Sequence, residues 1–188
     1  MLYFPIFLDL KGKECLVVGG GPVALRKSRQ LLCSRARVVV VSPSFIPEFG
    51  FYKNLQLYKK EYQPYFCQNK KVVIAATDQE KLNEKIARHA RKVDALVNVV
   101  DHQEMCDFIM PAVVSRGQLQ IAISSGGQSP ALAARLRREL EQSLPEETER
   151  QLAEAGEIRA LIKEGVRDPE LRRKILIKLG DLIKIREE

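Results

Sequence analysis

Three consecutive glycines, Gly19, Gly20 and Gly21, carry the clearest chemical signal in the chain. They follow a short apolar run, residues 15–18, and precede a segment with helical spacing. In the pattern G-x-G-x-x-A, ended here by Ala24, the first glycine permits a tight turn and the second lets the backbone approach a pyrophosphate. The helix N-terminus then offers unpaired N–H groups and a partial positive charge to the phosphates. The motif therefore predicts a dinucleotide site; the structural alternative is a glycine turn that only packs a helix.

The second expected strand, residues 37–41, lacks the acidic residue that holds the ribose of NAD in many dinucleotide-binding proteins. Ser42, Pro43 and Ser44 follow it instead. A serine can hydrogen-bond a ribose hydroxyl, but it does not repel a 2′-phosphate as a carboxylate does, and no arginine follows directly to attract one. These residues leave the choice between NAD and NADP open.

Asp101 is the best candidate for chemistry among the residues that follow the expected strands. Ligands bind outside the carboxyl ends of parallel strands, so a carboxylate there can face a nicotinamide and accept a proton while hydride leaves a substrate. The alternative is a solvated aspartate that starts a turn. His102 is adjacent but would point away in an extended chain, and His89 is expected to be a solvated helix residue. The strand-end residues that we expect to contact the cofactor are Gly19, Gly20, Gly21, Ser42, Pro43, Ser44, Thr77, Asp78, Asn98 and Val99.

A second candidate site is a glycine- and serine-rich segment, residues 124–130. Ser129 is a favoured N-cap and Pro130 a favoured first residue for the helix that follows, whose N-terminus and arginines suit carboxylates or phosphates. The alternative is a flexible loop with an ordinary cap and solvated arginines. Thr77 and Glu80 likewise have the spacing of a capping box, a purely structural role. The residues that we expect to bind a substrate are Ser124, Ser125, Gly126, Gly127, Ser129, Arg135 and Arg138.

The elements that must position these residues alternate between strand and helix, which predicts an α/β fold with an N-terminal Rossmann-like parallel sheet. The expected strands are 15–18, 37–41, 55–60, 71–76 and 95–100, and the expected helices are 23–33 and 79–92. The pattern then changes to a hairpin over 112–123 and a helix from 130. This α+β element is too small to bury its own apolar faces, so a homodimer is expected. The expected division is 1–111 (dinucleotide-binding domain), 112–145 (dimerisation region) and 146–188 (helical region).

The composition of the chain limits the classes of binding partner that are expected. The net charge is +7 and 45% of the residues are hydrophobic. The positive charge favours an anionic partner, but the basic residues are dispersed without interleaved aromatics, so a polyanionic small molecule is favoured over nucleic acid. No run approaches the length of a membrane span and no secretory cleavage pattern follows the N-terminus, so the expected location is the cytoplasm, away from membranes. The four cysteines contain no C-x-x-C pair, so no metal site is expected.

Several segments in a fixed order resemble the precorrin-2 dehydrogenase family, the dehydrogenase and ferrochelatase module of sirohaem synthases. The segments are 4–7 (FPIF), 17–27 (VVGGGPVALRK), 75–78 (AATD), 98–101 (NVVD), 108–112 (FIMPA) and 124–130 (SSGGQSP). The resemblance covers roughly residues 3–145, and the last 43 residues match only in being helical.

This resemblance implies NAD-dependent oxidation of precorrin-2 to sirohydrochlorin, with Asp101 as the key acid and Pro22, Val23, Pro43 and Ser44 against the cofactor. It implies an intertwined homodimer with its active site between the first two regions, and a polycarboxylate tetrapyrrole as substrate. Iron insertion into sirohydrochlorin is found in some members only, and it stays open for this chain. The alternative function is a binding module that senses NAD without catalysis.

Overall fold

A computed structural model describes residues 3–181 of the protein. The last part of the expected helical region, residues 182–188, and residues 1 and 2 lie outside the described residues. The chain divides between Ile109 and Met110 into two compact units, which are treated separately below. The expected three-part division, with its dimerisation region, stays a prediction.

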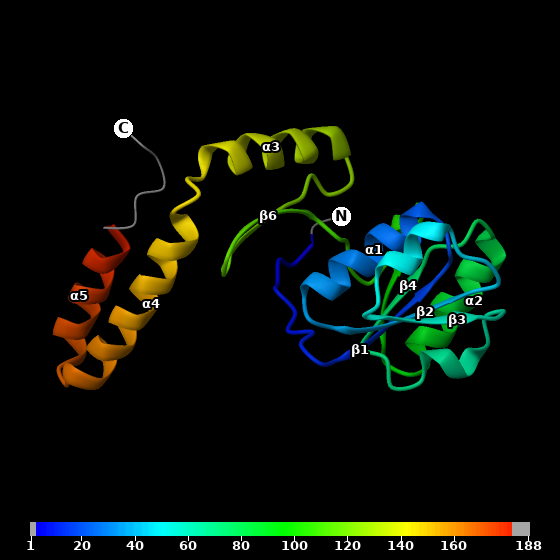
Figure 1. The fold of residues 1–188 in the computed structure, drawn as a ribbon, viewed down its shortest axis with the longest axis horizontal. Helices are drawn as coiled ribbons and strands as arrows, with labels where there is room; N and C mark the ends of the chain where they lie inside the picture. The colour runs from blue at the N-terminus through cyan, green and yellow to red at the C-terminus, as the bar shows by residue number, and fades with distance from the viewer. Residues whose placement is uncertain (1–2, 182–188) are drawn as a thin grey trace. The chain divides into compact units, whose positions relative to one another are not determined.

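The first unit is built on a five-stranded sheet in which every strand is parallel to its neighbours (Figure 1). The strands are β1 (Glu14–Val18), β2 (Arg37–Ser42), β3 (Leu55–Lys59), β4 (Val72–Ala75) and β5 (Leu96–Val99), in the order β3-β2-β1-β4-β5. Valine-rich runs form the central strands because a parallel sheet is covered on both faces, so that both sets of alternating side chains are buried. The predicted α/β fold with a Rossmann-like sheet is confirmed.

Two helices cover the sheet: α1 (Pro22–Cys33) connects β1 to β2, and α2 (Glu80–Arg91) connects β4 to β5. These two connections run in opposite directions along the strand order, so their right-handed crossovers place the helices on opposite faces. Ile86, Ala87 and Ala90 of α2 are buried in one core cluster with side chains from β1, β2, β4 and β5. Three short 3₁₀ segments complete the unit: η1 (Pro47–Phe51), η2 (Pro64–Cys67) and η3 (Gln103–Met105).

The strand order creates a crevice at the carboxyl edge of the sheet. The chain moves outward from β1 to β2 and β3, then crosses back to form β4 on the other side of β1. The loops after β1 and β4 therefore leave in opposite directions, which opens the space where ligands bind in such sheets. This placement puts Gly19 to Gly21 on one side of the crevice and Thr77 and Asp78 on the other.

The second unit contains an antiparallel hairpin, β6 (Ala112–Arg116) with β7 (Leu119–Ile123), followed by α3 (Pro130–Ser143). Val114 and Ala133 are buried where α3 packs on the hairpin. Ser129 caps α3 by accepting a hydrogen bond from the Leu132 N–H at 3.2 Å, as the sequence predicts. Two further helices, α4 (Thr148–Gly165) and α5 (Pro169–Asp181), pack side by side (Figure 1). In the described part of the chain, each helix is too short or too polar to cross a bilayer.

Candidate functional site

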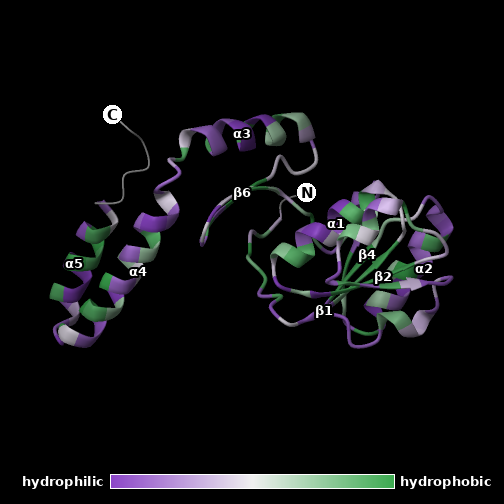
Figure 2. Ribbon diagram, in the orientation of Figure 1, coloured by the Kyte–Doolittle hydropathy of each residue, from purple (hydrophilic) through white to green (hydrophobic). Residues whose placement is uncertain are grey.

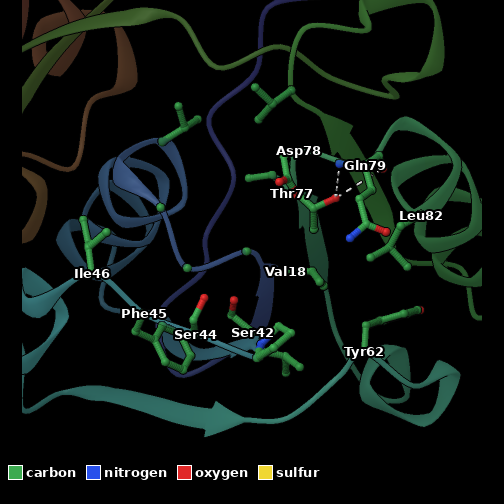
Figure 3. Close-up of a pocket in the computed structure, with 18 of the residues that line it drawn as sticks. Val18, Ser42, Ser44, Phe45, Ile46, Tyr62, Thr77, Asp78, Gln79 and Leu82 are labelled. Atoms are coloured by element: carbon green, nitrogen blue, oxygen red, sulfur yellow. Dashed lines mark hydrogen bonds between the residues drawn. The ribbon is translucent and has the colours of Figure 1, made fainter.

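A pocket of about 870 Å³ occupies the crevice at the carboxyl edge of the sheet. This volume is within the range of small-molecule sites. In Figure 3, Ser42 and Ser44 face the pocket from the β2 side, and Thr77, Asp78 and Gln79 face it from the β4 side. The sequence-predicted residues that line it are Gly19, Gly20, Gly21, Pro22, Val23, Ser42, Pro43, Ser44, Thr77, Asp78 and Asp101.

The three glycines of the loop after β1 have different physical roles. Gly19 has φ +134°, and a Cβ there would lie 2.2 Å from the Ala76 carbonyl oxygen. Gly20 has no room for a side chain either, because a Cβ would lie 1.8 Å from the Ser44 carbonyl oxygen. At Gly21, by contrast, a Cβ would have no protein atom within 4 Å. The first two glycines are therefore required by the protein's own packing, whereas Gly21 exposes its backbone to the pocket.

The N-terminus of α1 is left open beside Gly21. Its N-cap residue makes no side-chain hydrogen bond, and no acidic residue lies in its first turn. The first N–H groups of a helix have no partner within the helix and carry its partial positive charge. An open helix N-terminus beside a glycine backbone fits the pyrophosphate of a dinucleotide.

The opposite wall of the pocket is held by Asn83, a buried polar residue of α2. Its side-chain oxygen accepts hydrogen bonds from the Thr77 N–H at 3.2 Å and the Thr77 hydroxyl at 2.7 Å. Its side-chain NH₂ donates to the Thr77 carbonyl at 3.0 Å. The expected capping box is not formed, because α2 begins at Glu80 with Gln79 as its N-cap, and Thr77 lies outside the helix. Thr77 instead fixes the β4–α2 turn through Asn83.

Replacing Asn83 with Ala is expected to destabilise the protein by about 1–3 kcal/mol, because it leaves half-buried Thr77 backbone groups without their hydrogen-bond partners. It should also weaken cofactor binding, since the turn forms a pocket wall. Denaturant unfolding and calorimetry would measure the two effects. Glu84→Ala, an exposed change on the same helix, is the control and should stay within about 0.5 kcal/mol of the wild type. Equal stability of both variants would contradict the role of Asn83.

Asp101 lines the pocket two residues after the end of β5, and its backbone adopts φ +63°. Non-glycine residues rarely adopt such a conformation, and where they do the strain is often part of a functional site. Lys27 of α1 is close enough to interact electrostatically with Asp101; burial lowers the pKa of Lys27, and the Asp101 carboxylate opposes that shift. His102 pairs with Glu80 and Glu104. The left-handed turn thus presents one exposed carboxylate to the pocket.

Asn98 and Val99 do not line the pocket. Both residues are buried. The Asn98 side chain donates a hydrogen bond to the Phe108 carbonyl at 2.9 Å, and the Val99 N–H donates to the Cys106 sulfur at 3.1 Å. These contacts tie the end of β5 to the segment after η3. The structure therefore gives both residues a part in holding the turn that carries Asp101, and their contact with a cofactor stays a prediction.

Tyr62 is a pocket residue that sequence reasoning missed. Its hydroxyl lies 3.0 Å from the Cys67 sulfur and 3.1 Å from Nδ1 of His89, and its ring stacks on the His89 imidazole. His89 is therefore not the freely solvated residue that the sequence suggests. Burial raises the pKa values of Tyr62 and Cys67 and lowers that of His89, so all three favour their neutral forms. Tyr62 therefore gives the pocket a neutral aromatic wall. No spacing pattern in the sequence predicted this contact.

The predicted substrate residues all lie in the second unit. Ser124 accepts a hydrogen bond from the Gly126 N–H, and Ser125 accepts one from the Ser129 N–H, each at 3.0 Å. Gly126 and Gly127 have φ +63° and +87°, which explains the need for glycine. On α3, Arg135 and Arg138 are exposed, and Arg135 pairs with Glu139 at 3.4 Å. The segment is thus an ordered turn at a helix N-terminus, and substrate binding by it stays a prediction.

The chain is similar to two family models and to several known proteins. Residues 6–112 match the family model described as putative NAD(P)-binding, and residues 116–143 match the one described as sirohaem biosynthesis protein central. A siroheme synthase from Thioalkalivibrio sulfidiphilus is 41% identical over 177 residues, which are 93% of this chain and 36% of that protein. One from Nitrosomonas europaea is 42% identical over 152 residues, covering 77% and 31% of the two chains. The chain thus spans about a third of the length of these relatives.

A solved structure extends the likeness to the fold. The protein titled "SirC, precorrin-2 dehydrogenase" superimposes with a TM-score of 0.82 at 29% identity, covering 94% of this chain and 89% of that one. The glycine-loop pocket lies within the part matched by the NAD(P)-binding model, and that match supports a nicotinamide cofactor for this chain. The chain therefore belongs to the precorrin-2 dehydrogenase family, the NAD(P)-binding module of siroheme synthases.

Proposed function

We propose that this protein oxidises precorrin-2 to sirohydrochlorin with NAD. The observation that carries the proposal is the pocket that joins an open helix N-terminus at Gly21 to a carboxylate on a left-handed turn at Asp101. The likeness to a precorrin-2 dehydrogenase over nearly the whole chain supplies the substrate class. Cytoplasmic location remains the prediction made from the sequence.

The reaction removes one hydride and one proton from the tetrapyrrole. NAD, when bound, would supply the acceptor for the hydride. The protein's own residues bind and orient the reactants. The Gly21 backbone and the start of α1 hold the pyrophosphate, and the Asp101 carboxylate accepts the proton that the substrate loses as its new double bond forms.

The charges of the pocket favour NAD over NADP. Its lining includes three acidic residues, Glu61, Asp78 and Asp101, and no lysine or arginine from the described residues. A 2′-phosphate carries additional negative charge and is normally recognised by a basic side chain. The described lining of the pocket therefore offers no basic side chain to pair with that phosphate.

The substrate is a polycarboxylate, and we propose that Ser124 to Ser129 and the exposed arginines of α3 bind some of its carboxylates. Replacing Arg135 and Arg138 together with Ala should raise KM for precorrin-2 while leaving the Kd for NAD unchanged, and the effect should shrink at high salt. Lys81→Ala with Lys85→Ala, on exposed positions of α2, removes the same charge as a control. An identical KM in the arginine variant and the wild type at low salt would show that these arginines do not contact substrate.

Iron insertion is a second candidate, favoured by the relatives that are named siroheme synthase. In the part of the chain that the structure describes, no three His, Cys, Asp or Glu side chains gather as a metal site. The tetrapyrrole supplies its own four nitrogens, so the protein would need only a proton acceptor, a role that we propose for Asp101. The homodimer expected from residues 112–145 is likewise part of this proposal.

The experiment is anaerobic incubation of the protein with precorrin-2 and either NAD or NADP. We expect sirohydrochlorin and NADH to appear with NAD, and little product with NADP. Tight NAD binding without oxidation of precorrin-2 would contradict the proposal and favour a binding module that senses NAD.

A further inference from the structure

A groove of about 690 Å³ runs along the helical hairpin formed by α4 and α5. It lies within the second unit and is separate from the cofactor pocket. Figure 2 shows apolar and polar segments interleaved along both helices. The residues that line the groove are Leu152, Ala155, Gly156, Arg159, Pro169, Arg172, Arg173, Leu176, Ile177, Leu179 and Gly180.

The charged side chains of the groove are all basic: Arg159 from α4, and Arg172 and Arg173 from α5. Among the described residues none of the three forms an ion pair, although both helices carry glutamates. Arg150, earlier on α4, forms ion pairs with Glu147 and Glu154. Three guanidinium groups thus line one groove without an ion pair to any carboxylate of the described residues.

The floor of the groove is apolar. Leu152, Leu176 and Leu179 are half-buried, and Ile177 is 57% exposed. A ligand that covers the exposed apolar surface and also pairs with the neighbouring arginines would stabilise both features. Small inorganic anions would leave the apolar floor uncovered. Among the described residues, no aromatic side chain lines the groove, whereas single-stranded nucleic acid is bound by stacking on aromatic side chains.

We infer that the groove between α4 and α5 is a second site for a polycarboxylate macrocycle, in addition to the one proposed at α3, with the ring over the leucines and ring carboxylates on Arg159, Arg172 and Arg173. The inference rests on the proposed function for its ligand class, since the tetrapyrrole combines an apolar ring with a rim of carboxylates. Guanidinium groups pair with carboxylates through two parallel hydrogen bonds, which gives the site orientation as well as affinity.

The test uses uroporphyrin, a stable fluorescent porphyrin with eight carboxylates, titrated with the full chain. The variant Arg159→Gln, Arg172→Gln, Arg173→Gln should bind it at this second site at least about tenfold more weakly than the wild type, because charge-assisted hydrogen bonds are lost. The matched control Lys163→Gln, Lys174→Gln, Lys178→Gln removes the same charge from exposed positions of α4 and α5 outside the groove. It should change the affinity by less than about twofold.

Equal weakening in both triple variants would overturn the inference, because it would show only diffuse attraction between charges. Unchanged affinity in the arginine variant, together with a changed molecular mass by light scattering, would make the groove an interface between copies. Precorrin-2 oxidation is assayed in parallel. If the wild-type protein oxidises precorrin-2 but the arginine variant binds uroporphyrin as well as the wild type does, the groove alone is refuted. If uroporphyrin binding depends on the groove arginines but the wild-type protein does not oxidise precorrin-2, the proposed function alone is refuted.

Discussion

Replacing Asp101 with Ala should lower kcat for precorrin-2 oxidation by a factor on the order of 10²–10⁴, the usual contribution of a positioned acid–base group. The Kd for NAD, measured by calorimetry, should stay close to the wild-type value. The pocket walls at Gly19 to Gly21 and Thr77 do not depend on the Asp101 side chain, which is exposed. A loss in kcat with unchanged cofactor binding is therefore the signature expected of a proton acceptor.

Asp101→Asn separates the charge of the side chain from its shape. It keeps hydrogen bonding, and Asn tolerates the left-handed backbone at φ +63° well. If the Asn variant is as slow as the Ala variant, the carboxylate charge is required. Oxidation by Asp101→Ala near the wild-type rate would show that hydride transfer proceeds without proton acceptance by this residue.

The second large effect is expected for Gly21→Asp, which should weaken NAD binding about a hundredfold or more, equivalent to about 3 kcal/mol. The new carboxylate would occupy the space of the pyrophosphate and repel it. Folding should be preserved, because a Cβ at Gly21 meets no protein atom within 4 Å and its φ of −93° suits any residue.

Two further variants serve as controls for this result. Gly21→Ala adds bulk without charge and should give an intermediate affinity. Gly20→Ala should instead reduce stability, because its Cβ would collide with the Ser44 carbonyl. Wild-type NAD affinity in a folded Gly21→Asp variant would remove the basis for placing the pyrophosphate there.

The sheet and the glycine loop could be predicted because each has a local cause. Valine runs such as Val38 to Val41 indicate strands buried on both faces, and the switch to helical spacing after Gly21 indicates the crossover. Given the strand order, the right-handedness of these crossovers places α1 and α2 on opposite faces of the sheet. Ser129 as the cap of α3 was predictable from its position before Pro130.

The remaining parts of the site depend on contacts between distant residues. Asn83 reads as an ordinary helix residue until folding places its amide against Thr77. Tyr62 and His89 are 27 positions apart, and no spacing rule joins them. Strand periodicity could not show that Asn98 and Val99 are held by Phe108 and Cys106, away from the pocket. Tertiary hydrogen bonds decide these roles.

The most direct test of the account is a single-turnover experiment with NAD-saturated protein in excess over precorrin-2, without oxygen. The absorbance of NADH and that of sirohydrochlorin should rise together, with the same rate constant and in a ratio of one to one. Asp101→Ala should slow both signals equally. Formation of sirohydrochlorin without NADH, or at an equal rate when NAD is omitted, would contradict hydride transfer to a cofactor bound at the glycine loop.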